Sequence, residues 1–266
     1  MLRVLTLNVW NLSGPWRDRR AEIVTWLDRL APDVVCLQEV VEGYDGRNQA
    51  RRVAELAAGD WHVAYAGSPS EWYAGGRFGN AVLSRWPVDV CHAEDLPLTP
   101  ASDEVQRLVL HARTNGLDVF CTHLNWRYDN GAMREQQVQR VVEVVEERAD
   151  PGSPVPPIVC GDLNAEPDAT EIRFLTGLAS LGGRSTYFQD AWRVAGGGGP
   201  GWTWDNRNPF AAAEHEPDRR IDYILVGWRN DDGAGQVESA RVVCDRALTG
   251  TFASDHFGLV ADIATT

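Results

Sequence analysis

Short apolar runs separated by polar turns recur along the whole chain. The first of them, RVLTLNVW between Arg3 and Trp10, alternates hydrophobic with polar positions. Such alternation is typical of a strand with one buried face, and continuous apolar runs are typical of strands buried on both faces. By this pattern we predict strands at residues 3–10, 33–40, 61–66, 80–84, 105–113, 117–123, 157–160, 221–226, 237–243 and 257–263.

Between these strands lie segments in which apolar residues recur at helical spacing. The clearest spans residues 133–148, where Val138, Val141 and Val145 share one face. Helices are predicted in the same way at residues 17–30, 48–58, 133–148 and 168–178. No long linker interrupts the alternation, so we predict one α/β domain over residues 1–266, with helices covering the outer faces of two sheet layers.

Polar side chains stand at the ends of several of these apolar runs. The opening strand ends near Asn8, and the run IVC is followed at once by Asp162 and Asn164. The similar positions elsewhere are Gln38, Glu39, Thr122, His123, Asn125, Asp222, Asp255 and His256. One buried polar group without a partner costs free energy, and several together suggest a shared rim where strand ends meet. Carboxylates would repel one another there, so the pattern favours a divalent cation with oxygen ligands.

The balance of charges narrows the range of functions. The 266 residues carry a formal net charge of −13, and all 25 basic residues are arginine. An acidic chain lacks the broad basic surface of proteins that coat nucleic acid, although it can hold one phosphate locally through a metal. Without lysine, Schiff-base chemistry on an amine side chain is excluded.

Cysteine usage and hydropathy bear on the compartment. The five cysteines show no paired spacing, which argues against both a disulfide framework and a cysteine zinc site. The N-terminus shows no secretory leader, and no apolar run approaches the roughly 20 residues of a membrane-spanning helix. We therefore expect a soluble, cytoplasmic and monomeric protein.

Seven motifs in a fixed order carry a resemblance to a known family. They are LTLNVW, LQEV, GNAVLSRWP, THLN, GDLNAEP, RRIDYILV and SDHFGLVADI, and they run from Leu5 to Ile263. In this order they resemble the endonuclease/exonuclease/phosphatase superfamily, which includes deoxyribonuclease I, exonuclease III, neutral sphingomyelinases and inositol-polyphosphate 5-phosphatases. The resemblance implies a four-layer α/β/β/α sandwich of the deoxyribonuclease I type, with the active site at one end of the two sheets.

The resemblance also implies a metal site. Glu39 in LQEV would be the main Mg²⁺ ligand, helped by Asn8 and Asp255, and Mn²⁺ is an alternative ion. From the residues alone, Asn8 could instead close a turn through its side chain, and Asp255 could only shape the turn before His256.

Five further residues have catalytic roles by the same resemblance. Asp162 would orient and deprotonate the attacking water, and Asn164 would donate its amide to a phosphate oxygen. Asp222 would hold His256 and favour its protonated form, and His123 would act in the same way from the other side of the phosphate. Outside the motifs each has a structural alternative, such as a turn after a strand or a histidine packed in the core.

The residues that would select the substrate carry a weaker signal. Asn80 and Arg220 are candidates for phosphate contacts, although Asn80 could simply begin a strand and Arg220 could pair with an acid. Trp126 and Trp202 could stack on bases, contact a lipid interface or pack the rim. His123 occupies the place where abasic-site endonucleases carry tyrosine, which points toward the deoxyribonuclease I, sphingomyelinase and phosphatase branches.

Together these features predict a Mg²⁺-dependent phosphoesterase that cleaves a phosphodiester by in-line attack of water. A small or single-stranded phosphodiester, or a phosphorylated metabolite, fits the negative charge best, and of these we favour a single-stranded or small nucleic-acid substrate. The alternatives on the same site are a sphingomyelinase-type phospholipase and a sugar or inositol phosphate phosphatase, which acts on a phosphomonoester. A catalytically inactive binding module, and a non-phosphate hydrolase that uses Glu39 and Asp162 as an acid–base pair, are further alternatives.

Overall fold

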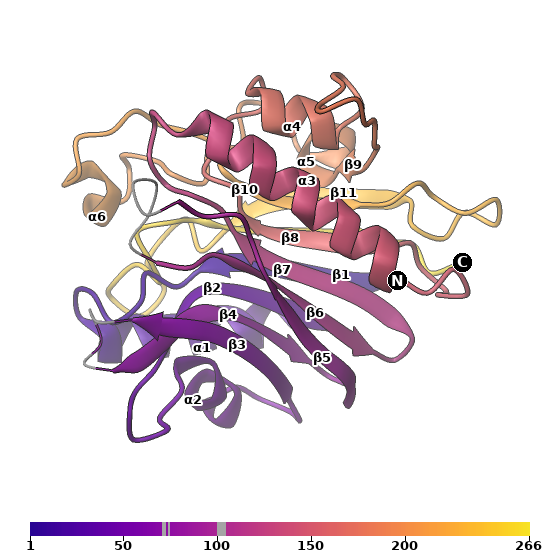
Figure 1. The fold of residues 1–266 in the computed structure, drawn as a ribbon. Coiled ribbons are helices and arrows are strands. Elements are labelled where there is room, and N and C mark those ends of the chain that lie inside the picture. Colours follow the sequence, from indigo (N-terminus) through magenta and orange to yellow (C-terminus); the bar gives the residue numbers. More distant parts are fainter. Residues whose placement is uncertain (71–72, 74, 100–104) are drawn as a thin grey trace.

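Two six-stranded sheets pack face to face at the centre of the molecule (Figure 1). The structure is a computed structural model that describes residues 1–70, 73, 75–99 and 105–266. The first sheet contains, in spatial order, β11 (Val237–Val243), β12 (Gly258–Ile263), β1 (Leu2–Asn8), β2 (Val34–Glu42), β4 (Gly76–Ser84) and β3 (His62–Ser70). The second contains β5 (Val88–Asp95), β6 (Leu108–Thr114), β7 (Leu117–His123), β8 (Ile158–Asp162), β10 (Asp222–Val226) and β9 (Gln189–Asp190).

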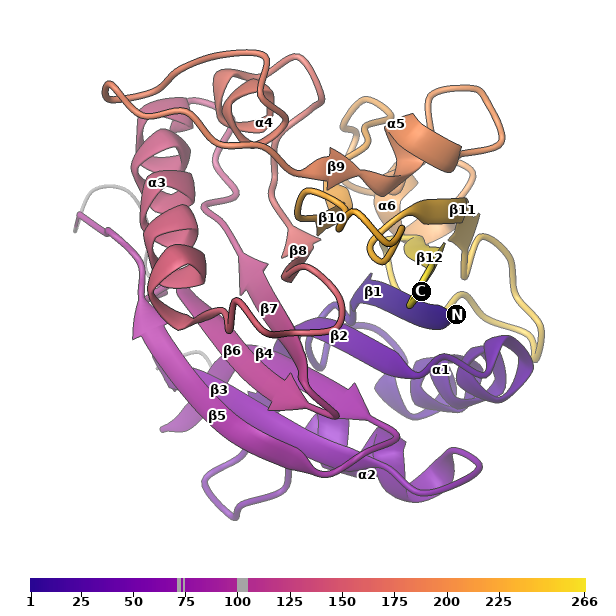
Figure 2. The ribbon, with the colours of Figure 1, turned by 90° about the vertical axis from the view of Figure 1, so that its right-hand side faces the viewer.

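Helices cover the outer face of each sheet (Figure 2). The helices on the first sheet are α1 (Trp16–Leu30) and α2 (Gln49–Leu56), and those on the second are α3 (Gly131–Arg148) and α4 (Thr170–Leu175). Two short helices, α5 (Ala191–Ala195) and α6 (Pro209–Ala212), lie between β9 and β10 in sequence. The order helix, sheet, sheet, helix confirms the predicted four-layer sandwich. Within the described ranges, no helix has the length and apolar content that crossing a membrane requires.

Alternation along β1 builds two apolar layers at once. Leu5 and Leu7 belong to the outer layer, together with Trp26 of α1. Val4 belongs to the core between the sheets, which contains residues of both sheets. Because side chains alternate between the two faces of a strand, Asn8 falls on the same inner face as Val4. The polar end of β1 therefore lies at the edge of the core between the sheets.

Strand register brings the polar strand ends together. In the parallel pair β7–β8, His123 lies opposite Asp162, and in the antiparallel pair β8–β10, Asp162 lies opposite Asp222. In the other sheet β1 and β2 run parallel, with Asn8 opposite Gln38. The rim of polar groups that the sequence predicts is therefore present at one end of the sandwich.

Several elements differ from those that the sequence pattern predicts. The pattern misses β5, an edge strand of half-buried and exposed residues that includes several charges. β6 begins at Leu108, and α4 is shorter than the predicted helix at 168–178 because Gly177, with φ +75°, follows its end. The assignment of residues 1–266 to one domain stays a prediction, which the core shared by both sheets supports.

Candidate active site

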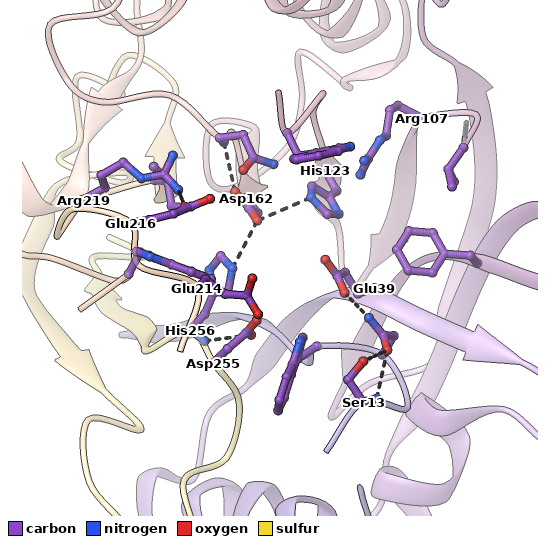
Figure 3. A pocket seen from close by; sticks show the side chains of 18 of the residues that line it. Ser13, Glu39, Arg107, His123, Asp162, Glu214, Glu216, Arg219, Asp255 and His256 are labelled. Carbon is purple, nitrogen blue, oxygen red and sulfur yellow. Dashed lines mark hydrogen bonds and ion pairs between the residues drawn. The ribbon is translucent and has the colours of Figure 1, made fainter. Parts of the chain in front are cut away.

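A cavity of about 520 Å³ opens at the end of the sandwich where the polar strand ends meet (Figure 3). Seven of the residues predicted for the site line it, namely Glu39, His123, Trp126, Asp162, Asn164, Asp255 and His256. Further charged and aromatic residues complete its wall, among them Trp10, Tyr73, Phe78, Arg107, Trp204, Glu214, Glu216 and Arg219. The cavity thus combines acids, bases and aromatic surface in one place.

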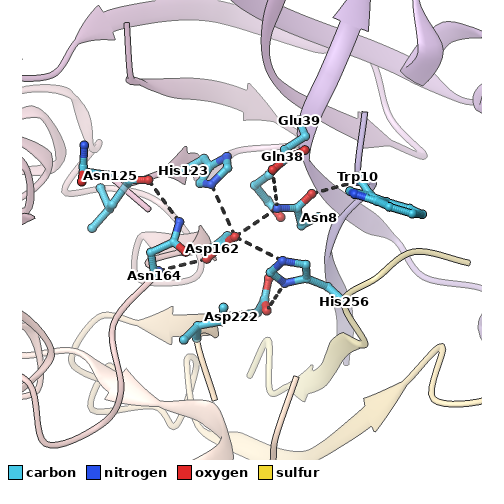
Figure 4. A network of polar contacts seen from close by, with 12 residues as sticks. Asn8, Trp10, Gln38, Glu39, His123, Asn125, Asp162, Asn164, Asp222 and His256 are labelled. Carbon is cyan, nitrogen blue, oxygen red and sulfur yellow. Dashed lines mark hydrogen bonds and ion pairs between the residues drawn. The ribbon is translucent and has the colours of Figure 1, made fainter. Parts of the chain in front are cut away.

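Asp162 lies at the centre of a polar network in this cavity (Figure 4). Its Oδ2 accepts a hydrogen bond from Asn8 Nδ2 at 3.0 Å, and lies 3.4 Å from His123 Nε2 and 3.7 Å from His256 Nε2. Its Oδ1 accepts from the backbone N–H of Asn164 at 2.9 Å. Burial, together with nearby negative charge, raises the pKa of Asp162 to about 6. The carboxylate is thus able to gain or lose a proton near neutral pH.

His256 lies between two carboxylates. Its Nδ1 is 2.9 Å from Oδ2 of the fully buried Asp222, and its Nε2 faces Asp162. Burial alone would lower the pKa of His256, but the charges of Asp222 and Asp162 outweigh burial and raise the pKa to about 10. The imidazole is therefore protonated at neutral pH.

A β-bulge in β2 directs Glu39 into the cavity. The pairing of β2 with β4 shifts register between Leu37 and Val40, and Glu39 has φ +60°, in the left-handed region. That conformation is unfavourable for a residue with a side chain, and such strain is found preferentially at functional sites. In the cavity, Glu39 Oε1 accepts from Asn8 Nδ2 at 3.2 Å and Oε2 accepts from Asn11 Nδ2 at 2.7 Å.

Glu39 and Asp255 bring two acids to the same cavity. Burial raises the pKa of Asp255 to about 7; the charge of His256 acts against this shift and the charge of Glu39 adds to it. A bound cation would relieve this repulsion between carboxylates. Carboxylate oxygens are ligands that Mg²⁺ and Mn²⁺ prefer, so these residues fit a divalent cation.

A different set of residues has its ligand atoms close enough together for one cation. Ligand atoms of Asp162, Asp222 and His256 lie within 4.8 Å of one another. However, His256 Nδ1 and Asp222 Oδ2 already share a hydrogen bond, and a protonated imidazole has no lone pair for a metal. In this set His256 is therefore hydrogen-bonded to Asp222 and lies 3.7 Å from Asp162, so the imidazole is not free to bind a cation.

Comparison with known proteins identifies the family of the chain. The sequence profile of the Endonuclease/Exonuclease/phosphatase family matches residues 5–256. The chain belongs to this family. Members of the Endonuclease/Exonuclease/phosphatase family are metal-dependent hydrolases that act on phosphodiester bonds, so the chain is identified as an enzyme of this class.

Individual relatives within the family are distant in sequence. Uncharacterized protein YbhP of Escherichia coli (strain K12) is 29% identical over 180 residues, which cover 61% of this chain and 66% of YbhP. A family protein from Beutenbergia cavernae has a TM-score of 0.65 at 26% identity, over 98% of this chain and 71% of that one. D. rerio TDP2, solved with single strand DNA product, has a TM-score of 0.73 at 19% identity, over 99% of this chain and 98% of that one. The chain thus spans about two thirds of the length of YbhP, and TDP2 shows the fold alone.

The protonation state of His123 differs from the protonated form that the sequence analysis expects. Burial, together with the positive charges of Arg107 and His256, lowers the pKa of His123 well below its usual value. The ring is therefore neutral at neutral pH, in contrast with the protonated form expected from the sequence. It still lies beside Asp162 and carries one N–H that can donate.

Three predicted substrate contacts lie outside the residues that line the cavity. Asn80 is buried between the sheets, where its Nδ2 donates to the carbonyls of Leu108 and Cys121. Arg220 is buried in a two-pronged ion pair with Asp190, which corresponds to the structural alternative. Trp202 is partly exposed but does not line the cavity. The structure therefore gives these three residues no contact with the cavity.

Sequence reasoning missed Arg19, a fully buried arginine beside the acids of the cavity. Burial lowers the pKa of Arg19 to about 10, while the charges of Asp255 and Glu39 act against that shift. Its guanidinium donates to the backbone carbonyls of Val9, Trp10, Asn11, Ser13 and Ala253. Arg19 thus ties the loop after β1 to the loop that carries Asp255. In the sequence WRDRRAE it resembles one charge among several on an exposed helix face.

Proposed function

We propose that this chain is a Mg²⁺-dependent phosphodiesterase that cleaves single-stranded or small nucleic-acid substrates by in-line attack of water. The observation that carries the proposal is the position of Asp162, held among Asn8, His123 and His256 in a cavity that also contains Glu39. Family membership supplies the reaction class, and the cavity supplies a role for each of these groups.

Glu39 and Asp255 would hold the cation. When bound, a divalent cation stabilises negative charge on the phosphate oxygens and on the leaving oxygen. The amides of Asn8 and Asn11 donate to the two oxygens of Glu39 and so fix the direction of its carboxylate in advance. Mg²⁺ suits these ligands because it takes one or two carboxylates and completes its shell with water and phosphate, and Mn²⁺ accepts the same donors.

Asp162 would act as the general base. Hydrogen bonds from Asn8 Nδ2 and from the backbone of Asn164 hold its two oxygens. Its pKa, which burial raises to about 6, suits proton transfer near neutral pH. The carboxylate would orient a water for in-line attack on phosphorus and take its proton. Asn164 lines the same wall; one N–H of its amide donates to the carbonyl of Leu124 at 3.2 Å, and the second N–H would donate to a phosphate oxygen.

His256 would stabilise the negative charge that develops on the phosphate. Asp222 holds Nδ1 of the protonated ring, so Nε2 can donate a hydrogen bond on the cavity side. His123, neutral because of its lowered pKa, can donate one N–H from the neighbouring strand. Both donors lie close to Asp162, which keeps the attacking water and the phosphate in register.

The nucleic-acid substrate rests on two supports. The side chain of Trp126 lines the cavity and is 52% exposed, so a base could stack on it. D. rerio TDP2, which shares the fold, is solved with single strand DNA product. The monomeric state remains a prediction, which light scattering on the purified protein would test.

A substrate panel with Mg²⁺, Mn²⁺ or EDTA tests the proposal. It contains bis-p-nitrophenyl phosphate, single-stranded DNA and RNA, sphingomyelin and inositol phosphates. We expect either ion to support cleavage of the aryl diester and the oligonucleotides, and EDTA to abolish it. Asp162→Asn should lower kcat at least about 100-fold, which excludes a contaminant. Turnover of sphingomyelin or inositol phosphates alone would assign the alternative substrates, and activity in EDTA would refute the metal-dependent mechanism.

The cation site has a test that does not depend on turnover. A ligand present at about 100 times its Kd stabilises the folded state by about 2.7 kcal/mol. We therefore expect Mg²⁺ to raise the melting temperature of the wild type and to have much less effect on Glu39→Gln. The control is Glu42→Gln, at the end of the same strand and outside the cavity lining. An equal response of both variants to Mg²⁺ would remove Glu39 from the ligand set.

A further inference from the structure

A second cavity, of about 830 Å³, adjoins the active-site cavity. It is lined by the start of α1, by α2 and by the loop between β2 and α2. Tyr73 lines both cavities, so the two are neighbours on the surface. The four arginines of its lining are Arg20, Arg47, Arg51 and Arg52, and we call this cavity the arginine groove.

The arginine groove carries an excess of positive charge in an acidic protein. Arg47 pairs with Asp45 at 3.1 Å and Arg52 pairs with Glu55 at 2.7 Å, both at exposed positions. Among the described residues, Arg20 and Arg51 have no acidic partner within ion-pair distance, and Asp45 and Glu55 are the only acids of the groove lining. The groove therefore has two more positive than negative side chains, while the whole chain carries −13.

Apolar surface is interleaved with these charges. Tyr44 is 84% exposed and Leu12 is 45% exposed, although both line the groove. Trp16, at the first position of α1, is half-buried in the same wall. An exposed ring, here Tyr44, next to unpaired arginines is typical of surfaces that bind single-stranded nucleic acid, where bases stack on aromatic rings and guanidiniums contact phosphates.

We propose that the arginine groove binds the part of a single-stranded nucleic acid that continues from the scissile phosphodiester. This inference rests on the proposed function. The active-site cavity is lined by five acids, Glu39, Asp162, Glu214, Glu216 and Asp255, against two arginines, so before a cation binds it attracts a polyanion less than the groove does. The neighbouring groove supplies the attraction that the cavity lacks. The enzyme should therefore bind an oligonucleotide more tightly than an isolated diester.

Salt dependence of binding measures this contact directly. A labelled oligothymidylate of about 16 nucleotides is titrated by fluorescence anisotropy in EDTA, which prevents cleavage. For single strands the slope of log K against log salt changes by about 0.7 for each phosphate contact. We expect the double variant Arg20→Gln/Arg51→Gln to reduce the magnitude of the slope by about 1.4, and Tyr44→Ala to weaken binding about tenfold.

A matched control distinguishes the effect of the groove arginines from the effect of removing two positive charges anywhere on the surface. Arg148→Gln/Arg229→Gln removes two exposed arginines that line neither cavity and should leave affinity and slope unchanged. Equal losses in both double variants, or no loss in the groove variant, would overturn the proposal. The proposal would also be overturned if Arg20→Gln/Arg51→Gln lost binding to phosphatidylserine vesicles but kept binding to the oligonucleotide, because the groove would then bind a membrane surface.

The same proteins keep the two proposals distinguishable. Hydrolysis of bis-p-nitrophenyl phosphate with Mg²⁺ tests the chemistry without any contact to the groove. Absence of that hydrolysis would contradict the proposed function. If the diester is hydrolysed but the groove variant has an unchanged KM for the oligonucleotide, only the proposal for the arginine groove would be contradicted.

Discussion

The Asp222–His256 pair sets the charge on the residue that would donate to the phosphate. Because burial alone lowers the pKa of His256 and the two carboxylates raise it to about 10, removal of one carboxylate should lower that pKa. His256 in Asp222→Asn should then lose its proton at lower pH. We expect the alkaline limb of the kcat–pH profile to move down by about one to three pH units.

A second buried pair provides the control for this prediction. His111 Nε2 lies 2.8 Å from Asp118 Oδ1. Both residues belong to the second sheet, as Asp222 does, but neither lines the active-site cavity. Asp118→Asn should lower the free energy of unfolding and leave the pH profile in place. An unchanged profile in Asp222→Asn would show that His256 does not act through its protonated form.

Arg19 should act as a positioning residue because of the shape of its guanidinium. A lysine keeps the charge but has one nitrogen, so it cannot replace both Nη1, which donates to the carbonyls of Val9 and Ala253, and Nη2, which donates to the carbonyl of Ser13. We expect Arg19→Lys to lower the free energy of unfolding by roughly 2–4 kcal/mol, measured by urea denaturation. It should also reduce the rise in melting temperature with Mg²⁺.

The control is an arginine at the opposite end of β1. Arg3 pairs with Asp262 at 2.7 Å and donates to the carbonyl of Leu30, but its side chain is 35% exposed. Arg3→Lys should cost about 1 kcal/mol or less and leave the Mg²⁺ response unchanged. If both variants behaved alike, Arg19 would have only a general structural role.

At the scale of elements, close contact between β7 and β8 aligns the site. A Cβ added to Gly161 would lie 1.9 Å from the backbone oxygen of Thr122, so only glycine fits between these strands. Gly161→Ala should separate His123 from Asp162, lower kcat and destabilise the fold by roughly 1–3 kcal/mol. Gly197→Ala, where no heavy atom lies within 4 Å of the added Cβ, should change neither quantity. Wild-type kcat in Gly161→Ala would show that this strand contact is not critical.

Most elements follow from local pattern, and the exceptions have physical causes. The apolar alternation in β1 and the valines of α3 predict their burial correctly, because burial on one face imposes a period. The pattern does not predict β5 because an edge strand needs little apolar surface. The pattern also does not predict the bulge at Glu39, because the bulge depends on pairing with β4, a strand about 40 residues further along the chain.

The same distinction applies to the candidate site as a whole. Acids and imidazoles at strand ends are visible in the sequence because polar groups there interrupt apolar runs, and Asp162, His256 and Glu39, which stand at such places, all line the cavity. Asn80 resembles them in sequence, but its amide crosses from β4 to carbonyls of the second sheet. The arginine groove was not visible, because residues from α1, α2 and loops meet only in three dimensions.

The core between the two sheets predicts how the whole molecule unfolds. Residues of both sheets share that core, and Gln38 Nε2 and Asn80 Nδ2 donate across it to Cys121 Sγ and the Cys121 carbonyl. We therefore expect one cooperative transition, with equal urea midpoints by tryptophan fluorescence and far-UV circular dichroism. Leu110→Ala, in the fully buried core, should lower both midpoints together and cost roughly 2–5 kcal/mol. Separate midpoints for the two probes would mean that the sheets unfold independently and would contradict the assignment of one domain.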